Sequence, residues 1–426
     1  MRSHRLIPPL GVPYGIGDYI AGTLASFRQA PAPPDSLKAV FGDRPLFWTG
    51  SGRQALWLIL RALNLPAGAG IAVPLFGSTS VPLTISSMGF EPIFLDVQKS
   101  TLTVDPADIE RIKHRISAIV VEHLFGHLAD MPQILEAASG IPVIEDTAQA
   151  PLSFLNGRMA GSFGVASFYS FASSKYLPAA GGGLAAINSP DLAVEFARQA
   201  RQLTPPARLV ELRGGVMQAA KAALFRRPFY GLAGHAARSS TKPRSLFTAN
   251  LDLQAIARGS AAVVLRQADG FAERVREQQS NSLFLIDQLA GIPGIDLPYQ
   301  PPGAIHNRAL FPVLVADSRE RDAVRAGMRS SGVDTSRLHS NSPECAQAFG
   351  YKGDCPVSEQ AASTLVVLPN QAGLSRDDLK RVAASFRAAL EAHRSSARRS
   401  DQLFRSCNGG FHRETVTNRK RKAVTP

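Results

Sequence analysis

Two linked stretches carry the strongest structural signal, Glu145-Asp146-Thr147-Ala148-Gln149-Ala150 and Phe168-Tyr169-Ser170-Phe171-Ala172-Ser173-Ser174-Lys175. Each closes a short apolar run that is typical of a buried strand, and a glycine triplet at 181–183 comes after the second. Lys175 follows Asp146 by 29 residues. Open α/β sheets bind their ligands at the carboxyl ends of the strands, so we expect Asp146 and Lys175 to share a site.

An acid and a lysine in this arrangement are the groups that pyridoxal phosphate chemistry needs. The lysine can bind the aldehyde of the cofactor, and the carboxylate can keep the pyridine nitrogen protonated so that the ring draws electrons. A lysine that forms imines must be partly deprotonated, and partial burial favours that form. The alternatives are that Asp146 only caps a helix and that Lys175 is a surface residue. The aromatic neighbours Phe168, Phe171 and Tyr176 favour the cofactor site.

Short apolar runs alternate with helical patterns through the first half of the chain. The helical patterns include 53–64, 106–114 and 131–138. The expected strands are 70–74, 91–95, 118–122, 142–145, 166–170 and 184–187. This alternation predicts parallel βαβ units, and therefore an α/β fold whose mostly parallel sheet carries helices on both faces.

The pattern divides the chain into four parts. Residues 1–45 are rich in proline and are expected to be irregular, and residues 46–250 form the large domain. Residues 251–393 are expected to form connecting helices and a smaller C-terminal α+β domain. The tail, 394–426, is polar and lacks periodicity, so we expect it to be disordered.

The smaller domain is expected to begin with one or two long helices over 251–289. Its strands are expected at 307–315 and 365–368, and its later helices at 319–330 and 376–392.

The positive charge of the chain is unevenly distributed. Residues 198–244 contain ten Lys and Arg residues and one acid, Glu211, so their net charge is +9. Residues 394–426 have a net charge of +7. Since the whole chain carries +13, the remaining residues total −3. The basic character belongs to an insert and a tail, so net charge does not favour a nucleic-acid function for the main body.

Length and composition indicate a globular protein. The chain has 426 residues, of which 45% are hydrophobic and 19% charged, enough for two or three domains. It contains no uninterrupted apolar run long enough for a spanning helix, and its start lacks a signal-peptide pattern, which favours a cytoplasmic protein. Cys345, Cys355 and Cys407 lack metal-ligand spacing, so we expect free thiols and no bound metal.

A phosphate site is expected at the start of the helix at 53–64. Gly52 precedes this helix, whose first backbone N–H groups can bind an anion. Arg53 can add a guanidinium group, and Ser170 a hydroxyl donor. His123 ends the strand before the Asp146 strand, and a structural role is the favoured interpretation of this lone histidine.

Taken together, these segments resemble the DegT/DnrJ/StrS family of pyridoxal-phosphate-dependent sugar aminotransferases. The resemblance covers residues 45–195 well and 250–390 loosely. It rests on the order and spacing of GSGRQALWLIL, VPLFGSTS, GFEPIFLDV, LTVDPADIE, AIVVEHLFGHLADMPQI, IPVIEDTAQA, GRMAGSFG, FYSFASSK and GGGLAAIN.

The resemblance implies a type I, aspartate-aminotransferase-like fold and a homodimer with its active sites at the subunit interface. By position, Lys175 would bind the cofactor covalently, Asp146 would face the pyridine nitrogen, and Gln149 would lie near the ring and its 3-oxygen. The phosphate would be held by Gly52, Arg53 and Ser170. One branch of the family has histidine in place of the lysine and performs dehydration. This chain has Lys175, which favours transamination.

Three departures from the family lie around the implied substrate and phosphate sites. Arg53 stands where the family usually has threonine, and Gly77-Ser78 where a threonine–aromatic pair often lies near the cofactor. Phe247 stands where an asparagine usually reaches the phosphate of the partner subunit. These changes indicate an unusual substrate or a weakened activity.

The basic insert at 198–244 is the least family-like piece. It mixes apolar residues such as Val216, Met217 and Phe229 with arginines, a composition that suits a helix on an anionic membrane surface. The alternative, which we favour, is a helical hairpin packed on the body or across the dimer.

The expected function is transamination of a keto-sugar, nucleotide-linked, with an amino acid donor such as glutamate. It would belong to surface polysaccharide or secondary-metabolite sugar biosynthesis. Two alternatives remain: a family member with lost or altered chemistry that binds the cofactor and acts in regulation or assembly, and a nucleic-acid-binding protein that uses the basic appendages. The second is disfavoured by the charge distribution, and no nucleic-acid partner is expected.

Overall fold

The computed structural model describes residues 6–29, 32–173, 175–227, 229–231 and 253–409, with side chains up to residue 399. Its centre is a seven-stranded sheet with the order β1-β9-β8-β5-β4-β2-β3. Five neighbouring strands, β3, β2, β4, β5 and β8, are parallel, and β9 is antiparallel to both β8 and β1. The strands are β1 (Leu46–Thr49), β2 (Gly70–Pro74), β3 (Glu91–Leu95), β4 (Ala118–Glu122), β5 (Val143–Asp146), β8 (Ala166–Ser170) and β9 (Gly183–Ile187). The predicted mostly parallel sheet is confirmed, and β1 is an additional edge strand.

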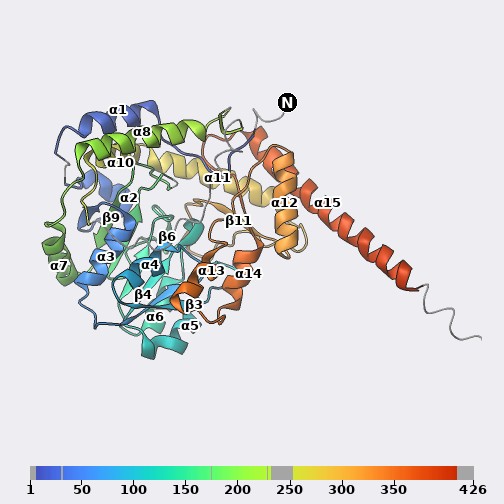
Figure 1. The fold of residues 1–426 in the computed structure, drawn as a ribbon, viewed down its shortest axis with the longest axis horizontal. Coiled ribbons are helices and arrows are strands. Elements are labelled where there is room, and N and C mark those ends of the chain that lie inside the picture. Colours follow the sequence, from blue (N-terminus) through green and yellow to red (C-terminus); the bar gives the residue numbers. More distant parts are fainter. Residues whose placement is uncertain (1–5, 30–31, 174, 228, 232–252, 410–426) are drawn as a thin grey trace, which may run out of the picture.

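Helices cover both faces of this sheet (Figure 1). One face packs against α3 (Gly52–Ala62), α4 (Ser80–Ser87) and α7 (Pro190–Ala200). The other packs against α5 (Pro106–Ile112) and α6 (Met131–Ala138). Every residue of β2, β4, β5 and β9 is buried, which explains why these strands are nearly continuous apolar runs in the sequence.

The C-terminal half is built on a two-stranded antiparallel sheet, β11 (Phe311–Leu314) and β12 (Leu365–Leu368). α11 (Phe271–Leu289), α12 (Ser318–Ser330) and α15 (Arg376–Gly409) pack around it. The predicted α+β character of this part is confirmed. The remaining elements are β6 (Phe154–Leu155), β7 (Arg158–Met159), β10 (Ala304–Ile305), α13 (Ser342–Ala346), α14 (Pro356–Thr364) and the 3₁₀ turns η3 (Lys113–Arg115), η4 (Leu124–Gly126) and η5 (Gln347–Phe349).

The prediction that residues 1–45 are irregular is wrong in part. Helix α1 (Ile16–Ala25) packs on α10 (Arg258–Ala268), and η2 (Asp35–Leu37) leads into the short helix α2 (Lys38–Phe41). The Gly15 N–H donates to Asp18 at 2.7 Å and caps the start of α1. The exposed side chains of α1 are apolar, so the polar face by which an amphipathic helix is usually recognised is missing from its sequence.

The N-terminal segment is anchored in the C-terminal half. Ile7 is fully buried in the core of that half, its N–H donates to the Gly332 carbonyl at 3.0 Å, and its own carbonyl accepts from the Asp334 N–H at 2.9 Å. The chain then passes from Ile7 through Pro8–Pro13 to Tyr14, which is buried against the large sheet together with α10 and α11.

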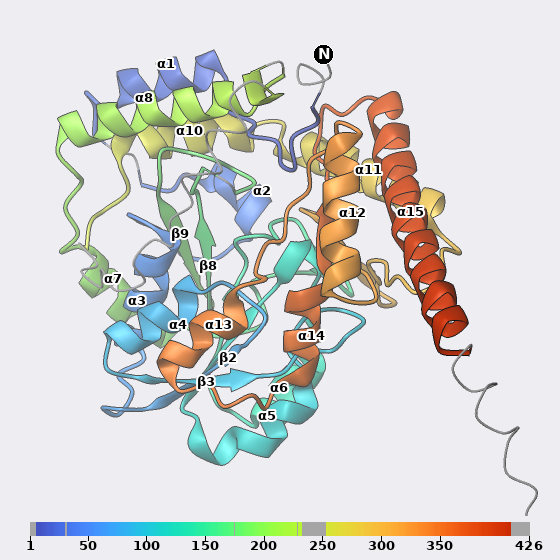
Figure 2. The ribbon, with the colours of Figure 1, turned by 45° about the vertical axis from the view of Figure 1, so that its right-hand side comes forward.

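The basic insert contributes one long helix, α8 (Arg208–Leu224). The helix is unbroken at Gly214-Gly215, where the sequence suggests an interruption. Figures 1 and 2 both show α8 beside α1, with α10 beneath them. Among the described residues, no helix is both long and apolar enough to cross a membrane.

The prediction of disorder from residue 394 is wrong for 394–409, because α15 continues to Gly409 and projects from the body (Figure 2). Arg394 donates to both carboxylate oxygens of buried Glu320, at 2.7 and 2.9 Å. Burial alone would raise the pKa of Glu320, but the hydrogen bonds from Arg394 and from the Ala316 N–H hold it below its ordinary value. This ion pair extends the helix beyond the expected end at 392.

We expect Arg394→Ala to lower the free energy of unfolding at pH 7 by about 1–3 kcal/mol, because it leaves a buried carboxylate without its main partner. The pKa of Glu320 is lowered in the folded state, so its stabilising contribution is present above the unfolded pKa and is lost as the pH falls through the folded pKa. The deficit should therefore shrink in acid. Urea titrations at neutral and acidic pH measure it, with the exposed Lys380→Ala as the control. A deficit that is independent of pH would contradict this account of α15.

Candidate active site

The ends of the strands bring the expected site residues to one edge of the sheet. Glu122, Asp146 and Ser170 are the last residues of the parallel strands β4, β5 and β8. β9 runs the other way, so its first residue, Gly183, lies at the same edge. The turn after β1 arrives there as well, because Ser51 forms a β-bridge with Gly182. These residues therefore lie at the edge of the sheet at which α/β proteins usually bind their ligands.

Asp146 lies at the floor of this edge and is 8% exposed. The Ala148 N–H donates to its Oδ1 at 2.9 Å, which fixes the carboxyl orientation. Burial raises the pKa of Asp146, while the positive charge of Lys175 and this hydrogen bond act in the opposite direction. Lys175 is therefore near enough to Asp146 for its positive charge to affect the carboxyl group.

Lys175 lies in the loop between β8 and β9, where its N–H donates to the Ala172 carbonyl at 2.9 Å. It lines a cavity of about 630 Å³ together with Ser78, Gln149 and His339. Pro8 and Leu10–Pro13 from the N-terminal segment line the same cavity. Lys175 is therefore on the wall of a cavity large enough for a cofactor and a substrate.

The side chain of Gln149 is held in a fixed orientation. Its Oε1 accepts from the Phe125 N–H at 2.8 Å, and its Nε2 lies 3.3 Å from Nε2 of His339. The amide NH₂ of Gln149 thus faces the cavity side of the site, where it can donate to an oxygen of a bound ring.

The predicted phosphate residues meet at the first turn of α3. A Cβ on Gly52 would lie 3.0 Å from Cβ of Ser170 and 3.2 Å from the Tyr169 carbonyl, so a side chain at this position would be crowded. Ser51 caps the helix by accepting from the Gln54 N–H at 3.2 Å. The structure therefore brings Gly52 and Ser170 together, whereas Arg53 is exposed on the next position of the helix.

Glu122 is a site residue that the sequence reasoning missed. It pairs with Asp146 across the parallel ladder, so the two carboxyl groups lie on the same side of neighbouring strands. Its two oxygens accept from the Ser78 N–H at 3.1 and 2.9 Å. A Cβ on Gly77 would lie 2.5 Å from Oε1 of Glu122, so the glycine leaves room for the carboxyl. The sequence does contain a signal for Glu122, because a glutamate ends this otherwise apolar strand just as Asp146 ends the next strand.

The electrostatics of Glu122 differ from those of an ordinary glutamate. Burial raises its pKa well above the usual value, and the nearby negative charge of Asp146 raises it further. The Ser78 hydrogen bond and the positive charge of Lys175 oppose this rise. Two adjacent buried carboxyl groups titrate as a pair, and proton binding to this pair is favoured by burial.

His339 is the second residue that was missed, because it comes from the C-terminal half. Its ring lies edge-on to Phe76 and Phe125, with centroids 6.1 Å away in both cases. Burial and the charge of Lys175 lower the pKa of His339 to about 3, so the imidazole is neutral. Only the folded chain places this histidine beside Lys175 and Gln149.

His123 is structural, as the sequence interpretation favoured. Its Nε2 lies 2.9 Å from Oε2 of Glu145, and its Nδ1 accepts from the Ala129 N–H at 3.2 Å. Glu145 is fully buried and also accepts from the backbone N–H groups of Gly161, Phe163 and Gly164. Phe247, the third predicted departure, lies outside the described residues.

A mostly parallel sheet with a buried acid at the end of one strand and a lysine after the next defines a protein of the type I, aspartate-aminotransferase-like fold. The chain belongs to the DegT/DnrJ/EryC1/StrS aminotransferase family, whose model matches residues 35–387. The fold and the family predicted from the sequence are both confirmed.

Individual relatives agree with this placement. The chain is 28% identical to the UDP-N-acetyl-3-dehydro-alpha-D-glucosamine 3-aminotransferase of Acidithiobacillus ferrooxidans, over 80% of this chain and 83% of that protein. It is 30% identical to the dTDP-3-amino-3,6-dideoxy-alpha-D-galactopyranose transaminase of Aneurinibacillus thermoaerophilus, over 80% and 84%. The structure of DesV from S. venezuelae, in complex with a ketimine intermediate, superposes with a TM-score of 0.69 and 26% identity, over 88% of this chain and 94% of that chain.

We expect Glu122→Gln to flatten the pH dependence of stability. Because the pKa of Glu122 is raised in the folded state, the native chain binds more protons than the unfolded chain above the ordinary glutamate pKa. Stability therefore falls as the pH rises through that interval, by at most about 1.4 kcal/mol per pH unit for one proton. Urea titrations of cofactor-free protein between pH 5 and 8 should show a smaller slope in the variant than in the wild type.

The exposed Glu136→Gln serves as the matched control, because it removes a carboxyl group without changing a buried one. It should leave the slope unchanged. Equal slopes for Glu122→Gln and the wild type would mean that Glu122 is ionised in the folded protein.

Proposed function

We propose that this protein is a pyridoxal-phosphate-dependent aminotransferase that moves an amino group from an amino acid, such as glutamate, to a nucleotide-linked keto-sugar. The observation that carries the proposal is that Ala148, Gln149 and Lys175 line one cavity, and that the Ala148 N–H binds the carboxyl group of Asp146 at the end of β5. Membership of an aminotransferase family supports it.

The residues at this edge fit the cofactor. Gly52 and Ser170 adjoin at a helix N-terminus, where donors suit a phosphate. The buried carboxyl of Asp146 suits a protonated ring nitrogen, and the Gln149 amide suits a ring oxygen. Lys175 would hold the cofactor covalently. When bound, pyridoxal phosphate supplies the aldehyde that takes up the amino group and a ring that withdraws electrons from the donor carbon.

Each residue then has a defined task. The Lys175 amine removes the proton from the α-carbon of the amino acid donor and, in the second half of the reaction, returns a proton to the sugar carbon that receives nitrogen. Asp146 would face the ring nitrogen, and the Ala148 N–H and Lys175 favour its charged form against the effect of burial. His339 is neutral, so it adds no charge that would compete with Lys175 for the carboxylates.

The cavity wall suits an anionic substrate. Arg226, Arg227 and Arg274 line it together with Lys175, whereas Asp378 is the one carboxylate among the lining residues of the described chain. Guanidinium groups bind the oxygens of a diphosphate in a fixed geometry. Relatives whose names specify UDP- and dTDP-linked sugars support a nucleotide-linked substrate here.

The departures from the family pattern bear on how the cofactor ring is contacted. Ser78 lines the cavity where an aromatic side chain is usual, and its N–H is already engaged by Glu122. We propose that the Glu122 carboxyl, which is admitted by Gly77, replaces the missing aromatic group in shaping the site. Arg53 is exposed and would reach the phosphate only by its backbone.

The remaining expectations are part of the same proposal. We propose a homodimer with active sites at the subunit interface, in the cytoplasm, acting in surface polysaccharide or secondary-metabolite sugar biosynthesis. No nucleic acid is needed for this function. The name of a spore coat polysaccharide biosynthesis protein of Bacillus subtilis supports the proposed role in surface polysaccharide. The name of an erythromycin biosynthesis sensory transduction protein of Saccharopolyspora erythraea supports the proposed role in secondary metabolism.

Replacing Lys175 with alanine should remove the borohydride-reducible absorbance band of the bound cofactor. It should also lower the rate of glutamate-dependent amination of a UDP- or dTDP-linked keto-sugar by at least about 10²-fold, because the proton-transfer group is lost. Spectrophotometry and product analysis measure the two effects. The exposed Lys352→Ala should change neither. A variant that keeps both properties would move the reaction to another lysine, whereas a wild type with a reducible band and no turnover would match the family member with lost chemistry.

Asp146→Asn should keep the cofactor bound but slow turnover by about 10²–10³-fold, because the amide still accepts from the Ala148 N–H but carries no charge for the ring nitrogen. The cofactor content and kcat of the purified variant separate these two effects. Asp191→Asn, at an exposed position, is the control. Unchanged kcat in Asp146→Asn would remove Asp146 from the proposed mechanism.

A further inference from the structure

Helix α1 presents an apolar stripe to solvent. Its exposed residues are Ile16, Ile20 and Leu24, and Phe27 continues the line beyond the end of the helix, with exposures between 50% and 74%. Their spacing of four, four and three residues places them on one face. The opposite face packs on α10, where the backbones of Gly22 and Gly259 approach closely. The stripe is therefore not part of the protein core.

Helix α8 extends this stripe into a broad surface. The two helices are antiparallel neighbours, because Arg226 near the end of α8 donates to the Tyr14 carbonyl, while Arg208 at its start lies over the ring of Phe27. Figures 1 and 2 show them side by side on the outside of the molecule. On α8 and just beyond its end, the exposed apolar residues are Leu209, Val210, Val216, Met217, Leu224 and Phe229.

This concentration is unusual for the chain. Of the fourteen large apolar residues that are exposed in the described structure, ten belong to this α1–α8 face. Contiguous apolar patches of this kind mark interaction surfaces, whereas single exposed apolar residues are common.

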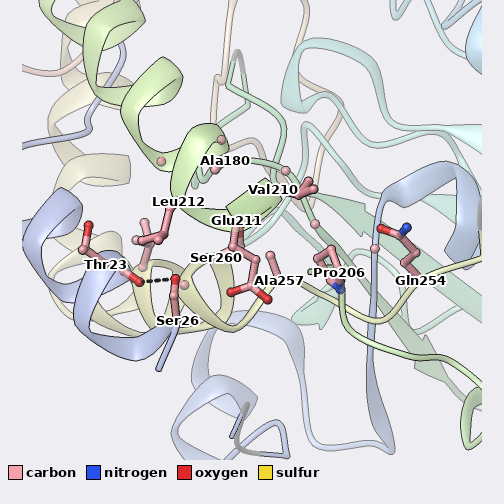
Figure 3. Close-up of a pocket in the computed structure, with 18 of the residues that line it drawn as sticks. Thr23, Ser26, Ala180, Pro206, Val210, Glu211, Leu212, Gln254, Ala257 and Ser260 are labelled. Atoms are coloured by element: carbon pink, nitrogen blue, oxygen red, sulfur yellow. Dashed lines mark hydrogen bonds between the residues drawn. The ribbon is translucent and has the colours of Figure 1, made fainter. Parts of the chain in front are cut away.

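The charges on the α1–α8 face are positive. Arg28, Arg208 and Arg213 are exposed on it. The acid of α8, Glu211, is buried on the inner side, where it accepts from Arg258 at 2.6 Å and lines a smaller cavity of about 170 Å³. Figure 3 shows Glu211 pointing from α8 toward α10. The acid of α1, Asp18, also has a mostly buried side chain, 13% exposed, which caps its own helix.

We propose that the α1–α8 face binds the surface of an anionic lipid bilayer. Apolar side chains on a helix that lies flat can enter the boundary between headgroups and acyl chains, and the flanking arginines bind the anionic headgroups. The sequence pattern pointed only to the basic insert, and the structure adds α1 as the more apolar half of the surface.

The charge pattern favours a bilayer over a second copy of the chain. In a symmetric dimer built on this face, the positively charged patch of one copy would face the same positively charged patch of the other. Among the described residues of α1 and α8, both acids have mostly buried side chains, so no exposed carboxylate is available to pair with them. An anionic membrane supplies the missing negative charge.

Docking by this face would also place the catalytic cavity near the bilayer. Phe225, Arg226 and Arg227, at the end of α8, line the cavity that contains Lys175. The C-terminal end of the membrane-binding helix thus forms part of the wall of the site. The membrane proposal does not require the proposed reaction, because the binding surface lies outside the catalytic residues.

The test is co-flotation of the full chain with vesicles. We expect the wild type to float with vesicles of equal parts phosphatidylcholine and phosphatidylglycerol, to remain in the dense fraction with phosphatidylcholine alone, and to be released by added salt. The double variant Ile20→Asp with Leu24→Asp should bind at least about tenfold more weakly, because it places charge in the apolar stripe. Arg213→Glu should also weaken binding to the anionic vesicles, because it replaces a positive charge on the α1–α8 face by a negative one.

Val194→Asp on α7 is the matched control, since Val194 is 74% exposed, as Ile16 is, but lies off this face. It should float like the wild type. Wild-type protein that stays in the dense fraction with anionic vesicles would overturn the proposal, and so would equal flotation of the double variant. The second measurement is sedimentation of the wild type and the double variant without lipid, which gives the oligomeric state of each. If the double variant is a smaller oligomer than the wild type, the face joins two copies and the membrane proposal is wrong.

Discussion

The burial of a carboxyl group at the end of β5 is the constraint on which the rest of the site depends. Asp146 is buried at the carboxyl edge of the sheet, where the Ala148 N–H and the charge of Lys175 offset part of the cost of removing it from water. The strand itself cannot move, since its neighbours on both sides are hydrogen-bonded and every residue of β5 is buried. A rigid sheet thus supports a group that would be unstable on a flexible loop.

Glu145, the residue before Asp146, holds the loops on the opposite side of the same strand. Successive side chains of a strand point to opposite sides, so Glu145 faces away from Asp146. Its carboxylate collects the N–H groups of Gly161, Phe163 and Gly164 and the ring of His123. Burial alone would raise the pKa of Glu145, but these donors hold it below the ordinary value, so it remains charged. One acid organises the surrounding loops, and the next one lies at the carboxyl edge of the sheet, where we propose that it contacts the cofactor.

The sequence predicted those parts of the fold that depend on local pattern. The strands at 70–74, 91–95, 118–122 and 166–170 have their expected bounds, because each is a mostly apolar, buried run bounded by polar or turn residues. Helix α1 was missed because its outer face is apolar, and the end of α15 was misplaced because Glu320, far away in the chain, holds Arg394. Glu122 and His339 could not be assigned to the site from local pattern, since their positions depend on strand pairing and on the approach of the C-terminal half.

The attachment of Ile7 to the C-terminal half has a consequence for how the protein should be handled. The short segment from Pro8 to Pro13 is fixed at one end by the pairing of Ile7 with Val333, and at the other by Tyr14 against the large sheet. It spans the two halves and forms part of the cavity wall. A deletion at the amino terminus that removes Ile7 is therefore not a neutral modification in this protein, since it frees a segment that forms part of the wall of the cavity lined by Lys175.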